Sequence, residues 1–205
     1  MSVYFIASDI HGSAYWCRKM LEKFLESGAE RMILLGDILY HGPRNDLPRD
    51  YAPKEVIDML NPYRQQIWAV RGNCEAEVDQ MVLDFPVMAD YAVLALNGHT
   101  IYATHGHVFN EKKLPPLMDG DALLHGHTHL LKAEWLEAGT ADGAAAKGTG
   151  SAPDGSGNGR FRFCHLNPGS VSIPKGGNPN TYAVLRDDVF TVYDFEDQVV
   201  ASVRI

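Results

Sequence analysis

Seven side chains with nitrogen or oxygen donors lie between residues 9 and 129, each just after an apolar stretch that is typical of a β-strand. Donors of these types, brought together from several strand ends, can hold two divalent cations side by side. The pattern therefore predicts an enzyme with a two-metal site. The predicted ligands are Asp9, His11, Asp37, Asn73, His105, His127 and His129.

The acidic and amide members of this set are compatible with two interpretations. Asp9 and His11 are two residues apart, so in an extended segment both side chains point to the same side and could share one ion. Asp37 and Asn73 each follow a glycine, and their side-chain oxygens are suitable ligands for hard cations; the Asp37 carboxylate could bridge two of them. Taken alone, however, Asp-x-His is more often a turn aspartate beside a surface histidine, and the other two motifs are also typical of turns.

The histidines favour the metal interpretation. His125, His127 and His129 alternate along one segment, and His105 and His107 repeat the spacing in another. Surface or core histidines seldom gather in this way, and imidazole is the commonest metal ligand. His107 is predicted to contact substrate or to orient His105. His125 is predicted to be a core histidine.

The elements that must position these residues indicate an α/β protein. In the first half, predicted strands alternate with predicted helices, the usual arrangement for a site at strand ends. Residues 40–53 are rich in turn residues and are predicted to form a long loop. The second half is strand-rich and contains an Asn97-Gly98 hairpin signal. The predicted helices are 14–25 and 53–60, and the predicted strands are 3–7, 32–35, 66–70, 91–96, 100–103, 122–124, 130–136, 161–166, 182–185, 189–193 and 198–204.

Composition limits the classes of protein that fit. The 205 residues are 45% hydrophobic, which suits a single domain, and the formal charge of −8 argues against nucleic-acid binding through a broad basic face. Three cysteines without paired spacing indicate neither a disulfide framework nor a zinc motif. With no apolar leader and no membrane span, a cytoplasmic protein is expected. Residues 138–159, rich in Gly, Ala and Ser, are predicted to be a flexible insertion.

The motifs Asp-x-His, Gly-Asp, Gly-Asn, His and Gly-His-x-His, in this order, resemble the signature of the calcineurin-like metallophosphoesterase superfamily. The runs 8–12, 42–45, 71–74 and 167–175 are similar to those of YfcE-type bacterial phosphodiesterases. The resemblance implies a four-layer αββα sandwich of two mixed β-sheets flanked by helices. It also implies that one ion is held by Asp9, His11 and His129, that the other is held by Asn73, His105 and His127, and that Asp37 bridges the two.

The activity implied by the resemblance is hydrolysis of a small phosphodiester by in-line attack of a hydroxide that bridges the two metals. The ligand types favour Mn, with Fe, Zn, Ni or Mg as alternatives. A phosphomonoesterase, a nucleotide pyrophosphatase and a non-catalytic scaffold stay open as alternatives, as does a homo-oligomer. The implied catalytic residues are Asp37, Asn73, Cys74 and His107, and the loop at 40–53 offers His41, Arg44 and Asn45 as substrate contacts.

Cys74 departs from the superfamily pattern, which places a histidine at this position. A neutral thiol is a poor proton donor, although two nearby cations would lower its pKa. The YfcE-type subgroup shares the cysteine, which is compatible with slow chemistry or an acidic leaving group. A role as a small filler beside Asn73 is an equal alternative.

Overall fold

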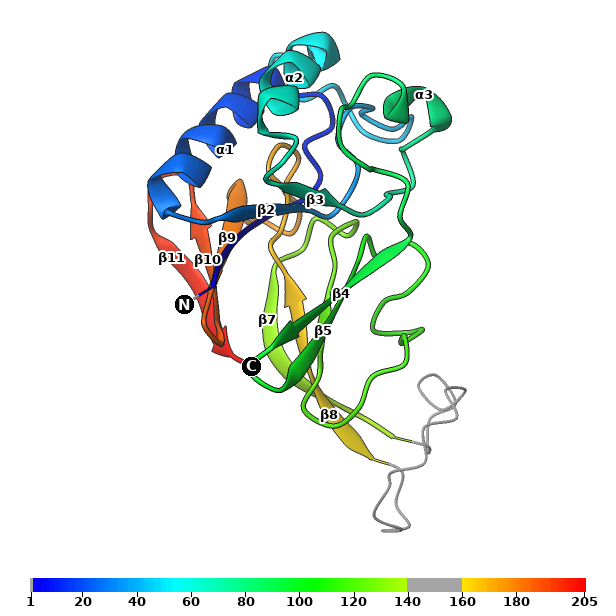
Figure 1. The fold of residues 1–205 in the computed structure, drawn as a ribbon, viewed down its shortest axis with the longest axis vertical. Coiled ribbons are helices and arrows are strands. Elements are labelled where there is room, and N and C mark those ends of the chain that lie inside the picture. Colours follow the sequence, from blue (N-terminus) through cyan, green and yellow to red (C-terminus); the bar gives the residue numbers. More distant parts are fainter. Residues whose placement is uncertain (1, 140–159) are drawn as a thin grey trace.

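The computed structural model describes residues 2–139 and 160–205, which form two β-sheets packed face to face (Figure 1). Most of the predicted insertion at 138–159 lies outside the described residues. In the part of the chain that is described, no helix is long and apolar enough to cross a membrane.

The first sheet has six strands in the order β11-β10-β9-β1-β2-β3, and β1, β2 and β3 run parallel. The antiparallel strand β9 joins this parallel part to the C-terminal hairpin, which makes the sheet mixed. Both faces of β1 are covered, which explains its nearly continuous apolar sequence. The strand bounds are β1 (Val3–Ala7), β2 (Arg31–Leu34), β3 (Ile67–Ala69), β9 (Thr181–Arg186), β10 (Val189–Asp194) and β11 (Val199–Arg204).

The second sheet has five strands in the order β4-β5-β6-β8-β7, with β5, β6 and β8 parallel and the two edge strands antiparallel. The turn between β4 and β5 has positive φ at both central residues, 51° at Asn97 and 88° at Gly98, as an Asn-Gly hairpin requires. The bounds are β4 (Tyr91–Leu96), β5 (His99–Thr104), β6 (Ala122–Leu124), β7 (Lys132–Ala138) and β8 (Phe161–Asn167).

Two helices cover the outer face of the first sheet. Helix α1 (Ala14–Ser27) begins where the Ser13 hydroxyl accepts a hydrogen bond from the Trp16 N–H, and it ends at Gly28 in the left-handed conformation. Helix α2 (Pro53–Leu60) has proline at its first position and continues into the 3-10 turn η1 (Asn61–Tyr63). The four-residue helix α3 (Glu77–Gln80) follows β3.

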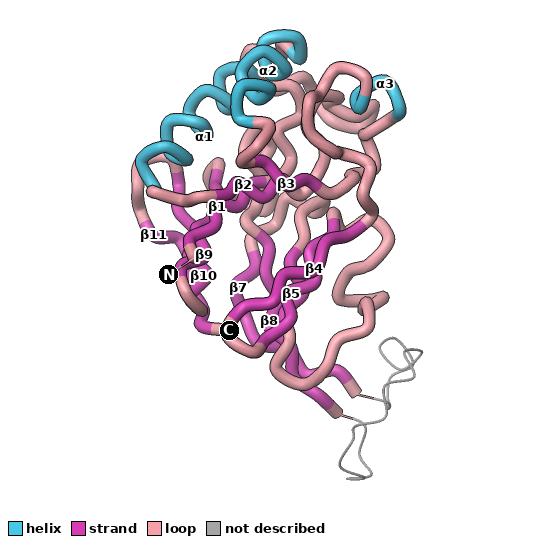
Figure 2. The backbone as a smooth tube through the Cα atoms, in the orientation of Figure 1, coloured by secondary structure: helices cyan, strands magenta, loops and turns pink. Residues whose placement is uncertain are grey.

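The hydrophobic core follows the layers of the fold, with separate apolar clusters between successive layers. One apolar cluster, which includes Ile6, Leu35 and Ile101, fills the space between the two sheets. A second cluster, including Phe5 and Phe24, lies between the first sheet and its helices. The outer face of the second sheet is covered by residues 105–121, a segment without helix that links β5 to β6 (Figure 2).

These observations confirm the predicted fold of two mixed sheets flanked by helices, with the difference that α1 and α2 cover the first sheet and the helix-free segment 105–121 covers the second. The predicted strands and the two predicted helices are all present, with ends within two residues of the predicted ones. The short helices η1 and α3 were not predicted, because three or four residues are too few to show helical periodicity.

We expect Phe5→Ala to lower the free energy of unfolding by about 3–5 kcal/mol, the usual effect of emptying a buried aromatic site. The Phe5 ring is fully buried and stacks on Tyr182 at 4.9 Å between ring centroids. Urea unfolding of metal-stripped protein would measure the change. Val93→Ala, at a side chain that is 55% exposed on an edge strand, is the control and should cost about 1 kcal/mol or less. Equal losses in both variants would contradict this account of the core.

Candidate metal centre

All seven predicted ligands meet where parallel strands of the two sheets end. Asp9, Asp37 and Asn73 follow β1, β2 and β3 of the first sheet. His105 and the segment 127–129 follow β5 and β6 of the second. Because the carboxyl ends of parallel strands lie at one edge of a sheet, side chains distant in sequence become neighbours there.

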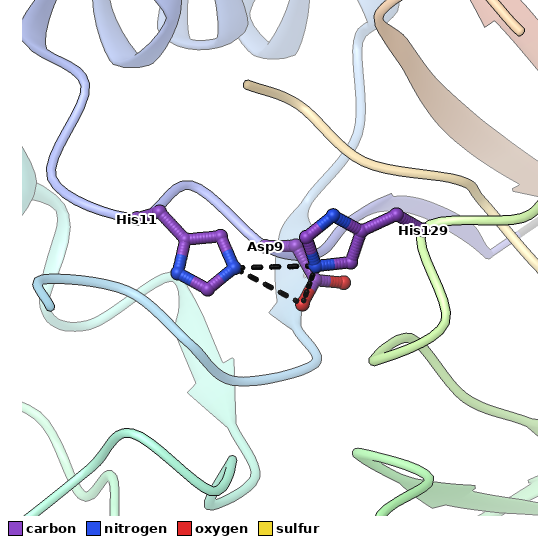
Figure 3. Close-up of side chains that lie close together, drawn as sticks. All are labelled: Asp9, His11 and His129. Carbon is purple, nitrogen blue, oxygen red and sulfur yellow. Dashed lines mark hydrogen bonds and ion pairs between the residues drawn. The ribbon is translucent and has the colours of Figure 1, made fainter. Parts of the chain in front are cut away.

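Asp9, His11 and His129 form one compact set, here called the Asp9 group (Figure 3). The Asp9 Oδ1 atom lies 3.2 Å from His129 Nε2 and 3.7 Å from His11 Nε2, and the two nitrogens are 3.2 Å apart. All three residues are buried. Among the described residues, Asp9 Oδ1 has no hydrogen-bond partner. A buried carboxylate oxygen left in this state is best stabilised by a cation.

The second set, the His105 group, surrounds the Nε2 atom of His105. This nitrogen is 3.1 Å from Asn73 Oδ1, 3.2 Å from His127 Nδ1 and 3.4 Å from Asp37 Oδ2. The same Asp37 oxygen lies 3.8 Å from His11 Nε2 of the Asp9 group. Asp37 therefore stands between the two groups, where a bridging ligand must be.

The spacing of these atoms fits metal coordination. Ligand atoms bound about 2.1 Å from one ion lie about 3.0–3.4 Å from each other in tetrahedral or octahedral geometry. The contacts within the His105 group, 3.1 to 3.4 Å, match this spacing. The assignment of each ligand to an ion stays a prediction.

Backbone carbonyls orient three of the imidazoles. His11, His105 and His129 each direct Nδ1 at a carbonyl oxygen, at 2.8, 2.6 and 2.5 Å. An Nδ1–H that donates there leaves the Nε2 lone pair facing the centre of the site, which is the tautomer that a metal ligand needs. The acceptors are Tyr40, Leu35 and Ile173, respectively.

The backbone itself is strained at the site. Five of the seven predicted ligands have φ between 49° and 64°. The left-handed conformation costs roughly 1–2 kcal/mol for a residue with a Cβ. Such strain persists only where surrounding contacts hold the chain, and it is concentrated at functional sites. The five residues are Asp9, His11, Asp37, His127 and His129.

The turn that follows β8 supports the Asp9 group. Ser170 and Ser172 both donate from Oγ to the carbonyl oxygen of Asp9, each at 3.0 Å. Asn167 donates to the carbonyl oxygen of Gly126 at 2.9 Å. A Cβ on Gly126 would lie 1.9 Å from Ser8 Oγ, so only glycine allows this close packing.

Glu75 is a supporting residue that the sequence analysis missed. Its buried carboxylate accepts backbone N–H bonds from Asp37 at 2.9 Å, Ile38 at 2.7 Å and Gly72 at 2.5 Å. It thereby joins the segment after β2 to the segment after β3. Burial, followed by the nearby charge of Asp37, raises the pKa of Glu75 to about 7. No sequence motif marks such a contact, because its partners lie up to 38 positions away.

The charges of the site depend on one another. Burial alone would raise the pKa of Asp9, yet the imidazoles of His129, His105 and His11 outweigh it and hold this pKa well below its usual range. The pKa of Asp37 is also lowered, because His105 outweighs the effect of burial. Both carboxylates are therefore anionic at neutral pH, as metal ligands must be.

A cavity of about 420 Å³ opens beside the His105 group. Asn73, His127 and His129 contribute to its wall, and so do Arg44 and Asn45, two of the predicted substrate contacts. Lys175, which was not predicted, adds a second cation. The third predicted contact, His41, is absent from this wall; its ring packs against Tyr40 and Tyr51.

Two further predicted catalytic residues, His107 and Cys74, lie beside the predicted ligands. The His107 ring is exposed, with its centroid 5.4 Å from that of His105 and 6.2 Å from that of His127. The Cys74 sulfur lies within 4.8 Å of ligand atoms of His11 and Asp37. Burial, with the Asp37 charge second, raises the pKa of the Cys74 thiol, so without bound cations the thiol is neutral. The predicted lowering by two cations stays a prediction.

We expect Glu75→Gln to weaken metal binding about 10–100-fold while the protein stays folded, because residues that orient metal ligands contribute by this amount. The amide nitrogen of Gln cannot accept a backbone N–H, so at least one of the three bonds is lost. Titration of metal-stripped protein with Mn²⁺ would measure the affinity. Glu77→Gln, on the exposed start of α3, is the matched control. Unchanged affinity in Glu75→Gln would show that these bonds do not position Asp37.

Comparison with known proteins agrees with this geometry. Residues 1–188 match the model of the calcineurin-like phosphoesterase superfamily domain. The chain is 44% identical to phosphodiesterase YfcE of Escherichia coli strain K12 over 200 residues, which are 97% of this chain and 96% of the relative. These matches confirm the predicted resemblance and the predicted class of enzyme, a phosphoric diester hydrolase.

Solved structures give the same result for the fold. A structure of the YfcE phosphoesterase from E. coli has a TM-score of 0.84 and 42% identity, with 99% of each chain covered. A Vps29 from Entamoeba histolytica has a TM-score of 0.52 at 17% identity, with 99% of each chain covered, and shows likeness of fold alone. The chain therefore belongs to the calcineurin-like phosphoesterase superfamily.

Proposed function

We propose that this protein is a metal-dependent phosphodiesterase that hydrolyses a small phosphodiester at a dinuclear centre. The observation that carries the proposal is the position of Asp37 Oδ2, 3.4 Å from His105 Nε2 and 3.8 Å from His11 Nε2. One carboxylate oxygen thus faces two sets of ligands at once. The high identity to a named phosphodiesterase over nearly the whole chain supports the same reaction.

The donor set fits two divalent cations, with Mn as the proposed metal, because every predicted ligand is an imidazole, carboxylate or amide. Two such ions would supply an activated water at neutral pH and neutralise the phosphate oxygens. The chain's own residues then fix the geometry. Within the His105 group, Asn73 is exposed and His127 is half-buried, and both line the cavity. The phosphate would therefore enter from their side.

Arg44 and Lys175 are proposed to hold the phosphate in the cavity. Both are exposed cations at its wall, and a guanidinium or ammonium is a strong partner for a phosphate oxygen. Lys175 is kept near the site by its backbone N–H, which donates to the carbonyl oxygen of His129 at 3.2 Å. Asn45 is restrained by a bond from Nδ2 to the carbonyl oxygen of His41 at 2.9 Å.

An apolar cavity is proposed to take the organic group of the diester. This cavity, of about 460 Å³, shares Cys74 with the polar one, so the two meet at the site. A substrate with an apolar alcohol could then place phosphate in one and the alcohol in the other. The apolar lining residues include Leu39, Tyr40, Tyr51, Ile57, Val78 and Val82.

A phosphomonoesterase is the second candidate, favoured by one observation. The pair Arg44 and Lys175 could offset the additional negative charge of a monoester. The ratio of turnover on bis(p-nitrophenyl) phosphate to turnover on p-nitrophenyl phosphate separates the two. A ratio above one supports the diesterase, and a ratio well below one supports the monoesterase.

Asp37→Ala should lower Mn²⁺-dependent hydrolysis of bis(p-nitrophenyl) phosphate about 100-fold or more, because the oxygen shared by both ligand groups is removed. The assay uses metal-stripped protein with Mn²⁺ added back. Asp58→Ala, at an exposed carboxylate on α2, should keep the parent rate. Turnover that survives in Asp37→Ala, or that needs no metal in the parent, would contradict the proposal.

Lys175→Met should raise KM for the same diester about tenfold and leave kcat within about threefold, because a charge-assisted contact of about 1.5 kcal/mol to the bound phosphate is lost. Steady-state kinetics at saturating Mn²⁺ would measure both constants. The control is Lys112→Met, at an exposed lysine outside the cavity wall. A fall in kcat without a change in KM would instead assign Lys175 to the chemical step.

A further inference from the structure

A second histidine cluster lies on the outer face of the second sheet. It consists of His165 on β8, His125 directly after β6, and Glu111 in the covering segment 105–121. The two imidazoles are fully buried, with ring centroids 4.9 Å apart and nearly parallel. The cluster shares no residue with the Asp9 group or the His105 group.

The donor atoms of this cluster converge. His125 Nε2 lies 2.7 Å from His165 Nε2 and 3.8 Å from Glu111 Oε2. Each of the three residues offers one ligand atom, and these three atoms all lie within 4.8 Å of one another. Two imidazoles and a carboxylate, with space for a water, are a common ligand set for a divalent transition metal.

The contact made by Nδ1 of His125 favours a lone pair on Nε2 of the same ring. His125 Nδ1 faces the carbonyl oxygen of Gly126 at 3.1 Å, which requires an N–H on Nδ1. His165 Nδ1 has no hydrogen-bond partner among the described residues, and the Glu134 carboxylate lies 3.6 Å from it. His125 Nε2 therefore carries a lone pair, and the 2.7 Å separation from His165 Nε2 requires a proton or a metal ion between the two nitrogens. A bound metal ion would replace that proton.

We propose that Glu111, His125 and His165 form a third, mononuclear site for a divalent cation of the Zn²⁺ class. His125 has the support that metal-bound imidazoles need, a carbonyl oxygen at Nδ1. Ligands of a tetrahedral Zn²⁺ lie about 3.3 Å apart, so the two nitrogens separate by about 0.6 Å on binding. Glu111 closes the site, since its side chain is 34% exposed on a loop and is free to shift.

A metal bound at this site would link the loop 105–121 to the second sheet. The described residues 105–121 contain no helix, and their apolar anchor is the contact of Leu114 and Leu117 with Leu123 and Phe163. A metal held by Glu111 on the loop and by His165 on the strand would add a second anchor. The same loop begins at His105 and includes His107, so a metal that holds the loop in place would also restrict these two residues beside the candidate metal centre.

Zinc content per chain tests the proposal without reference to activity. Metal-stripped protein is equilibrated with Zn²⁺, freed of unbound ions, and analysed by mass spectrometry for bound metal. We expect three Zn²⁺ per chain in the parent and two in His165→Gln, with at least tenfold weaker binding of the third ion in Glu111→Gln. His99→Gln and Glu137→Gln are matched controls outside the cluster and should retain three.

Crystals of the parent grown with Zn²⁺ give an independent measurement that does not depend on folding of the variants. An anomalous peak between His125 and His165 supports the site. Two Zn²⁺ per chain in the parent, unchanged in His165→Gln and with no such peak, would overturn it and assign the close nitrogens to a shared proton. Hydrogen exchange of residues 107–117 should slow with Zn²⁺ in the parent and not in His165→Gln.

Discussion

Burial of negative charge where the two sheets meet is the constraint on which the rest of this structure depends. Asp9, Asp37 and Glu75 all lie within the protein, where an unpaired carboxylate is costly. Glu75 is satisfied by three backbone N–H groups, but Asp9 keeps one oxygen without a partner among the described residues. Imidazoles compensate part of this charge, and bound divalent cations would compensate the remainder. The site is thus built for ions and is poorly satisfied without them.

The scaffold meets this constraint by bringing parallel strands from two sheets to one edge. These strand ends deliver the predicted ligands, and five of the seven predicted ligands have the left-handed backbone conformation. Hydrogen bonds to backbone carbonyls fix the imidazole rings, and serine hydroxyls hold the carbonyl of Asp9. The strain at these turns is offset by the two hydrophobic clusters on either side of β1. Rigid strands are thus combined with irregular loops that form the cavity wall.

The two outer faces of the sandwich are covered by different kinds of structure, helices on one and a loop on the other. Helices α1 and α2 cover the first sheet and fix the segments after β1 and β2. A loop covers the second sheet, held by a small apolar cluster and by the contacts of Asn110 and Asp121. The buried histidine pair lies beneath this loop, so the part of the fold with the least regular structure also has an unused set of metal-type donors.

The sequence alone predicted the candidate metal ligands, their order and all the strands of the described residues, because ligand chemistry depends on residue type and strands show an apolar pattern with turn signals. The Asn97-Gly98 turn is an example in which two residues specify local geometry. The superfamily could be predicted for the same reason. Only the tertiary structure decided the contacts of Glu75, the place of Lys175 at the cavity wall, the position of His41 away from that wall, and the pairing of His125 with His165. These are contacts between residues as far as 40 positions apart, or choices among equivalent loop residues. No local pattern encodes them, since they arise from how the two sheets and their loops pack.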